Sequence, residues 1–176
     1  MTTITISGTP GSGKSTVAEL LKDQLHLPYV YSGLLFRRLA KQHNMNLADF
    51  GSYCENNDEI DRQLDAKQVA ILTKGNVILE GRLAGWLAYL NNIPAFKIML
   101  DAPLEVRAQR VKKRENGSVE KRKEEIVKRE KSERVRYQKF YNIDLNNISI
   151  YDLVIDTSMK SPEEIVDIIK SHLQKQ

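Results

Sequence analysis

Eight residues near the N-terminus have the types and spacing of a phosphate-binding loop. The segment from Gly8 to Ser15 reads GTPGSGKS and matches the pattern G-x-x-x-x-G-K-[ST] at every fixed position. The glycines let the backbone curl so that several N–H groups point at one anion, and a helix that starts near Gly13 adds its positive end. Lys14 can reach the β- and γ-phosphates of a nucleotide, and the Ser15 hydroxyl can bind Mg²⁺. The sequence therefore predicts a site for a nucleoside triphosphate with magnesium.

The segments around this loop are those that such a site requires. Residues 3–7 are short and β-branched, which predicts a strand, and residues 14–26 carry apolar side chains at helical spacing. A chance glycine-rich turn would lack this strand before it and this helix after it. We expect ATP to contact nine residues of the loop: Gly8, Thr9, Pro10, Gly11, Ser12, Gly13, Lys14, Ser15 and Thr16.

A carboxylate and an arginine follow a second apolar strand, expected over residues 76–80. Ligands of a doubly wound sheet bind at the carboxyl ends of its strands, so Glu80 would face the phosphate-binding loop and hold Mg²⁺ through water. Gly81 permits close approach, and Arg82 can bind a phosphate with its fork of N–H groups. The alternative is a solvated strand end on which Arg82 makes a surface ion pair.

Another serine, glycine and arginine follow a short strand that is expected over residues 29–31. Ser32 is of a type that caps a helix N-terminus, and Ser32 and Gly33 would begin that helix. Arg37 would lie one turn further along, close enough to bind a second anion. The alternative is an ordinary helix with Arg37 exposed to solvent. With Arg82, Arg37 predicts a second phosphate site that faces the first.

Basic residues are concentrated in one long segment. Of the 27 Lys and Arg residues in a chain of net charge +4, 14 lie between Arg107 and Lys139, against six glutamates. Within this segment Arg129, Glu133 and Arg136 are spaced to lie on one helical face. Arginines on a closing lid would stabilise a transferring phosphoryl group and exclude water. The alternatives are a solvated helix with Glu–Lys pairs and, because nucleic acid is also anionic, an RNA-binding surface.

The elements that would position these residues alternate between short apolar runs and longer helical patterns. This alternation is typical of a parallel α/β sheet, and right-handed crossovers with helices on both faces would make a doubly wound, five-stranded sheet. The last two strands are expected over residues 95–100 and 153–155, and a capping box at 161–164 starts the last helix. Residues 32–73 are too many for one crossover, so we expect a helical insertion over the strand ends.

The composition limits the class of protein. The chain has 176 residues, 41% of them hydrophobic, which suits one domain with a buried core. No apolar run reaches the roughly 18 residues that a membrane span needs. The N-terminus enters a predicted strand without the features of a signal peptide, so we expect a cytoplasmic protein. With Cys54 as the single cysteine, a disulfide within the chain and a cysteine-rich zinc site are excluded.

Six motifs together carry a resemblance to a known family. They are the loop at 8–16, Ser32-Gly33 with Phe36-Arg37, the run EGRLAG at 80–85, Asp101-Ala102-Pro103, residues 129–136, and the run YDLVID at 151–156. The chain resembles the nucleoside monophosphate kinases over its whole length, and among them the archaeal branch of the cytidylate kinases. The resemblance implies one P-loop kinase domain over residues 1–176. Its core would comprise about 1–31, 74–113 and 141–176, with a monophosphate-binding insertion over about 32–73 and a short lid over about 114–140.

The resemblance also implies a role for each matching residue. Catalysis would fall to Lys14, Arg129 and Arg136, acceptor binding to Ser32, Gly33, Arg37, Asp61, Gly81, Arg82 and Glu133, lid contacts to Arg110 and Arg114, and metal binding to Ser15 and Glu80. Bacterial cytidylate kinases carry aspartate where this chain has Glu80 and Glu133. The longer Glu80 still allows a water-mediated metal contact, whereas the role of Glu133 stays open.

The implied activity is in-line transfer of the γ-phosphoryl group of ATP, with Mg²⁺, to CMP or dCMP by a monomeric enzyme that binds neither membrane nor nucleic acid. The base preference rests on the resemblance alone. Asp61 and Arg62 would supply polar groups to the base, unless they form a solvated helix end. Two alternatives remain: a kinase for AMP, UMP or a non-nucleotide such as shikimate, and an ATP-dependent RNA-binding protein. Against the second, the basic segment lacks interleaved aromatic residues.

Overall fold

Five parallel strands form one sheet in the computed structural model, which describes residues 2–174. The strands are β1 (Ile4–Gly8), β2 (Tyr29–Tyr31), β3 (Ile78–Glu80), β4 (Phe96–Asp101) and β5 (Leu153–Asp156). Their order is β2-β3-β1-β4-β5, and each neighbouring pair is parallel. The five-stranded parallel sheet predicted from the sequence is therefore confirmed.

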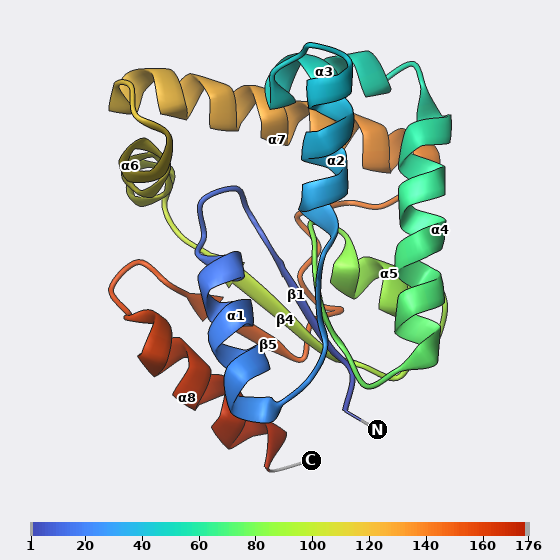
Figure 1. Cartoon of the computed structure of the whole chain (residues 1–176), viewed down its shortest axis with the longest axis vertical. Coiled ribbons are helices and arrows are strands. Elements are labelled where there is room, and N and C mark those ends of the chain that lie inside the picture. Colours follow the sequence, from blue (N-terminus) through green and yellow to red (C-terminus); the bar gives the residue numbers. More distant parts are fainter. Residues whose placement is uncertain (1, 175–176) are drawn as a thin grey trace.

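Helices cover both faces of this sheet. The described residues form α1 (Lys14–Leu25), α2 (Ser32–Gln42), α3 (Leu47–Cys54), α4 (Asp58–Lys74), α5 (Ala84–Leu90), α6 (Leu104–Glu115), α7 (Val119–Tyr141) and α8 (Pro162–Leu173). α1 and α8 pack side by side on one face, and α5 packs on the other with α4 beside it (Figure 1). Successive strand residues point to opposite faces, so Ile78 joins the first core and Leu79 the second. The sheet is doubly wound, as predicted.

The remaining helices lie over the carboxyl ends of the strands. α2, α3 and α4 fill the chain between β2 and β3, where the sequence predicts helices, and α3 packs against α7 (Figure 1). α6 and α7 pack against each other and are joined by a tight turn in which Asn116 and Gly117 have φ of 60° and 92°. Within residues 2–174, no helix combines the length and the apolar character that crossing a membrane requires.

Some local features differ from the expectations. The sequence analysis does not predict α5, because this short helix is apolar on all sides and has no helical periodicity. Ser32 does not cap α2: it is the first helical residue, and its Oγ donates to the Glu80 carbonyl oxygen at 2.8 Å. β1 ends one residue later than predicted, at Gly8, inside the loop motif. The capping box at the start of α8 is confirmed, with Ser161 and Glu164 bonded reciprocally.

Candidate active site

The phosphate-binding loop (residues 8–16) connects the carboxyl end of β1 to the first turn of α1. Gly11 and Gly13 have φ of 83° and 92°, a left-handed conformation that glycine adopts without steric cost. A Cβ at Gly11 would also lie 2.8 Å from the Arg107 carbonyl oxygen. Gly13 is the N-cap residue of α1 and no side chain caps this end. The first-turn N–H groups, which have no partner within the helix, therefore point toward the space where an anion would bind.

Two buried side chains hold this loop from outside. Arg107 of α6 donates from Nη1 to the Pro10 carbonyl oxygen at 3.2 Å and pairs with Glu130 of α7 at 2.8 Å. The Thr157 hydroxyl, just after β5, lies 3.0 Å from the Ser12 carbonyl oxygen. The sequence analysis singles out neither residue. Their partners in the loop lie 97 and 145 residues away along the chain, so no local pattern marks them.

Ser15 and Glu80 lie together beside the loop. Ser15 Oγ donates to Glu80 Oε1 at 3.0 Å, and the Tyr29 hydroxyl donates to Glu80 Oε2 at 2.5 Å. The sheet register sets Glu80 opposite Ile6 of β1, which is why its carboxylate reaches the loop. A carboxylate and a hydroxyl are hard oxygen donors, a set that suits a small divalent cation that is also bound by phosphates and water.

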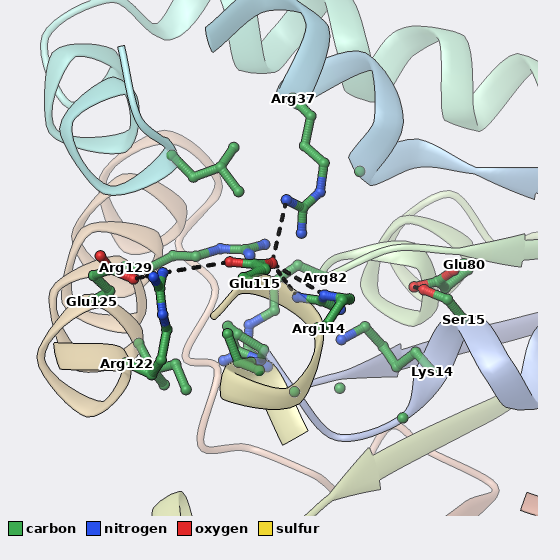
Figure 2. A pocket seen from close by; sticks show the side chains of 18 of the residues that line it. Lys14, Ser15, Arg37, Glu80, Arg82, Arg114, Glu115, Arg122, Glu125 and Arg129 are labelled. Atoms are coloured by element: carbon green, nitrogen blue, oxygen red, sulfur yellow. Dashed lines mark hydrogen bonds and ion pairs between the residues drawn. The ribbon is translucent and has the colours of Figure 1, made fainter. Parts of the chain in front are cut away.

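One cavity of about 320 Å³ joins the phosphate-binding loop to five arginines, which are Arg37, Arg82, Arg114, Arg122 and Arg129 (Figure 2). Lys14 and Ser15 line it on the loop side. Arg37 enters from α2, Arg82 from the segment after β3, and Arg129 from α7. The two guanidinium groups predicted to form a second phosphate site thus face the same space as Lys14. Gly81 also lines this cavity, and a side chain there would collide with Ser32.

Glu133 of α7 orients two of these arginines. It accepts from Arg82 Nε and from Arg129 Nε, each at 2.8 Å, and it is 2% exposed. Burial alone would raise the pKa of Glu133, but the charges of Arg129, Arg82 and Arg136 outweigh it and hold this pKa below its usual value. Glu133 is therefore ionised. Because both bonds use Nε, the terminal nitrogens of each guanidinium are left to face a ligand.

Lys14 carries a largely desolvated charge on the wall of this cavity. Its Nζ donates to the Thr9 carbonyl oxygen at 2.8 Å. Burial lowers the pKa of Lys14 from 10.5 to about 8, helped by the charges of Arg129 and Arg82 and opposed mainly by Glu80. A site that disfavours its own positive charge in this way is one that a polyanion would stabilise.

Glu115, the last residue of α6, occupies the centre of the arginine group (Figure 2). Its carboxylate lies 2.5 Å from Arg114, 3.6 Å from Arg122 and 4.0 Å from Arg37. Glu115 therefore neutralises part of the charge that would otherwise face a ligand phosphate.

A second cavity of about 70 Å³ continues from the first toward α4. The two share Arg37, Arg82 and Arg129 on their walls, so they adjoin each other at these side chains. Ser32 and Gly33 lie at the near end of this second cavity. The far end is formed by residues of α4 and α7.

Arg136 lies at that far end and not beside Arg129. Its Nη1 contacts both carboxylate oxygens of Asp61, at 2.6 and 2.7 Å, and its guanidinium lies 5.2 Å from the ring centres of both Phe36 and Tyr137. Arg136 lines the second cavity and is absent from the walls of the first. A buried ion pair fixes Arg136 against α4, and Arg129 lines both cavities, so the predicted catalytic role of Arg136 stays a prediction.

Two further polar residues of α4 line the second cavity, and the sequence analysis missed both. Gln68 Nε2 donates to Asp65 Oδ1, and the Tyr141 hydroxyl donates to Asp65 Oδ2, each at 2.7 Å. Asp65 and Gln68 follow Asp61 at i+4 and i+7, so their shared helical face was the available signal. Arg62 points elsewhere: it is exposed and pairs with Asp58 at 2.6 Å, which agrees with the solvated alternative.

The two predicted lid arginines lie at a third cavity, of about 340 Å³, between the phosphate-binding loop and α8. Arg110 donates to the Thr157 hydroxyl at 2.9 Å and to its carbonyl oxygen at 2.6 Å. These bonds hold Arg110 to the segment after β5, and its predicted lid contact stays a prediction. Arg114 is exposed and pairs with Glu115.

Comparisons with known proteins agree with this arrangement. Residues 3–159 match the cytidylate kinase-like family. The chain is 46% identical over 169 residues to a cytidylate kinase of Methanocaldococcus jannaschii, covering 96% of this chain and 95% of that one. It is 47% identical over 168 residues to a cytidylate kinase of Pyrococcus abyssi, covering 96% and 91%.

Solved structures with the same fold have low sequence identity. A shikimate kinase from Bacteroides thetaiotaomicron aligns with a TM-score of 0.61 at 13% identity over 98% of both chains. A gluconokinase from Sinorhizobium meliloti aligns with a TM-score of 0.68 at 15% identity, covering 99% of this chain and 92% of that one. These likenesses show the P-loop kinase fold alone. The sequence match over nearly the whole chain is more specific, and it shows that the protein belongs to the cytidylate kinase-like family.

Proposed function

We propose that this protein transfers the γ-phosphoryl group of ATP to CMP, and also to dCMP. The observation that carries the proposal is the single cavity that has Lys14 and the loop on one side and Arg37 with Arg82 on the other. A donor triphosphate and an acceptor phosphate require two such cationic sites within reach of each other. The archaeal relatives at 46% and 47% identity, named cytidylate kinases, support CMP over shikimate or another acceptor.

In this proposal the donor binds the phosphate-binding loop. Lys14 reaches the β- and γ-phosphates, and the first-turn N–H groups of α1 bind the β-phosphate. Ser15 and Glu80 would hold Mg²⁺, which would neutralise phosphate charge. The adenine ring enters the third cavity, where the Arg110 and Arg114 side chains line the wall and a guanidinium plane can stack on the base.

The acceptor spans the two adjoining cavities, from the shared arginines toward α4. Arg37 and Arg82 bind its phosphate, and the nucleoside extends into the second cavity toward Asp61 and Arg136. Arg129, oriented by Glu133, stabilises the charge on the phosphoryl group in transit.

The reaction is an in-line displacement. An oxygen of the acceptor phosphate forms a bond to the γ-phosphorus of ATP while the bond to the β,γ-bridging oxygen breaks, which releases ADP. The attacking oxygen is already anionic near neutral pH, so no general base is needed. Positioning and electrostatic stabilisation by the arginines supply the catalysis.

A panel assay of ADP release tests the proposal. We expect the purified protein with ATP and Mg²⁺ to phosphorylate CMP and dCMP with a higher kcat/KM than UMP, AMP or shikimate, and Lys14→Ala to abolish the activity. A preference for shikimate or AMP, or tight RNA binding at moderate salt without any monophosphate kinase activity, would contradict it. We further propose a cytoplasmic monomer, which size-exclusion chromatography checks for the oligomeric state.

A further inference from the structure

The second cavity contains, beside Gly81 and Ser32, an amide with an unused hydrogen-bond acceptor. Gln68 is 9% exposed, and its Oε1 is buried without a hydrogen-bond partner. Leaving a buried amide oxygen unpaired is costly, so the position invites a donor from a ligand. Gln68 lines the same cavity as Arg37 and Arg82. A nucleotide with its phosphate at those arginines would direct its base toward Gln68.

Asp65 fixes which way this amide points. Gln68 Nε2 donates to Asp65 Oδ1, while the Tyr141 hydroxyl donates to Asp65 Oδ2, each at 2.7 Å. Burial raises the pKa of Asp65 to about 7, so its carboxylate is ionised above that pH. If the amide turned over there, Oε1 would meet a carboxylate oxygen, and neither atom would carry a proton to share. Gln68 therefore keeps its oxygen, and the second hydrogen of its Nε2, for a ligand.

This orientation complements the pairing edge of cytosine. Cytosine carries an amino donor at C4 beside a ring-nitrogen acceptor at N3, and uracil carries the reverse, a carbonyl at C4 beside an N–H at N3. The amide oxygen can accept from the amino group of cytosine while the amide N–H donates to N3. Against uracil the same amide would oppose acceptor to acceptor. Phe36, Leu64 and Leu83 line the cavity and offer apolar surface to the base ring.

We propose that Gln68, oriented by Asp65, is the residue that selects cytosine over uracil in the acceptor nucleotide. The inference rests on the proposed function and deepens it. Gln68 contacts the base directly, and Asp65 acts through Gln68 as a positioning residue.

Substitution of Gln68 with a matched control gives the first test. Gln68→Leu keeps the size of the side chain and removes both polar atoms. Gln63→Leu makes the same change on the same helix at an exposed residue that bonds Glu59. We expect Gln68→Leu to lower kcat/KM for CMP by about 10- to 100-fold, with the KM for ATP unchanged, because the base loses two hydrogen-bond partners. Gln63→Leu should behave as the wild type.

Substitution of Asp65 separates positioning from a merely structural role. In Asp65→Asn the new amide can donate to Gln68 Oε1, which turns the Gln68 amide so that it suits uracil. We expect the ratio of kcat/KM for CMP to that for UMP to fall at least about tenfold, with a gain for UMP. A loss of packing alone would lower both pyrimidines equally and leave this ratio as in the wild type.

A third test changes the ligand and uses the wild-type protein, so its result does not depend on whether a variant folds. The wild type should use the analogue of CMP that lacks the 4-amino group far less well than CMP, and this difference should vanish in Gln68→Leu. If the wild type phosphorylates CMP but does not distinguish it from that analogue, or if both variants keep the wild-type preference for CMP over UMP, the assignment of Gln68 is wrong while the proposed function stands. If the wild type phosphorylates no pyrimidine monophosphate, the proposed function itself fails.

Discussion

At the scale of single residues, the candidate site is defined by an excess of positive charge around one space. Lys14, Arg37, Arg82 and Arg129 line the first cavity, and Glu133 orients two of the arginines without cancelling the excess. Burial lowers the pKa of Lys14, and the charges of Arg129 and Arg82 lower it further. A bound triphosphate would reverse this effect.

The pKa of Lys14 predicts proton uptake when ATP binds. In the free protein Lys14 loses its proton as the pH rises through about 8, whereas in the unfolded chain it does so near 10.5. The charged Lys14 therefore lowers the stability of the fold by its full amount below about pH 8. This loss shrinks as the pH rises from about 8 to 10.5. Triphosphate favours the charged form, so we expect proton uptake on ATP binding near about pH 8.5 and little near pH 7. Titration calorimetry in buffers of different ionisation enthalpy measures it. The same uptake at both pH values would contradict the assignment.

Arg129 is predicted to stabilise the transferring phosphoryl group. Arg129→Ala should lower kcat by about 10³-fold, with a smaller change in either KM, because the lost interaction belongs to the transition state. Arg134→Ala is the matched control, since Arg134 is an exposed arginine on the same helix. Steady-state kinetics of both variants decide the point, and equal losses would remove Arg129 from the catalytic role.

The site residues that the sequence predicts are those whose local pattern is specific. Lys14 and Ser15 belong to a motif with fixed spacing, and Arg82 directly follows a buried strand that ends at the sheet edge. Arg107 and Gln68 were not predicted, because each acts through a fold-dependent contact: Arg107 with the distant Pro10, and Gln68 with a cavity formed by other elements. An arginine or a glutamine can have many structural and binding roles, and only its contacts in the folded protein show which one it has.

At the scale of elements, the α6–α7 pair forms one wall of the first cavity. The turn at Asn116 and Gly117 joins the two helices, and Glu115 directly before it lies among Arg37, Arg114 and Arg122. Glu115 thus links the end of α6 to Arg37 of α2, the side chain that in the proposed function binds the acceptor phosphate.

Removing this carboxylate charge should help the acceptor bind. Glu115→Gln is expected to lower the KM for CMP by up to about fivefold, because exposed ion pairs of this kind contribute up to about 1 kcal/mol. Glu124→Gln, at an exposed position on α7, is the control. Initial rates at low ionic strength measure the effect, and a raised KM in Glu115→Gln would mean that the carboxylate assists binding.

The sequence predicted the helices that have a clear N-terminal cap or a regular apolar stripe. The α8 start carries a capping box that the sequence displays in full, and α1 carries an apolar stripe. α5 was missed because Ala84–Leu90 has no polar face. This helix packs between the sheet, α4 and the end of α7, so it needs no polar face.

At the scale of the whole molecule, the doubly wound sheet brings the site residues together. β1 and β3 are adjacent and parallel, so the loop after one and the residues after the other meet at one edge. The alternation of strands and helices predicts this meeting. The depth of the second cavity could not be predicted, because it depends on how α2, α4 and α7 pack over that edge.

The central claim is that donor and acceptor phosphates bind at once in one space, between Lys14 and the pair Arg37 and Arg82. Its most direct test is the affinity, by titration calorimetry, for adenosine and cytidine joined 5′ to 5′ through five phosphates. The account predicts binding about 10²-fold or more tighter than ATP alone, since the second site is then occupied intramolecularly, and loss of that gain in Arg37→Ala and Arg82→Ala. Binding no tighter than ATP, or a gain that both variants retain, would contradict it.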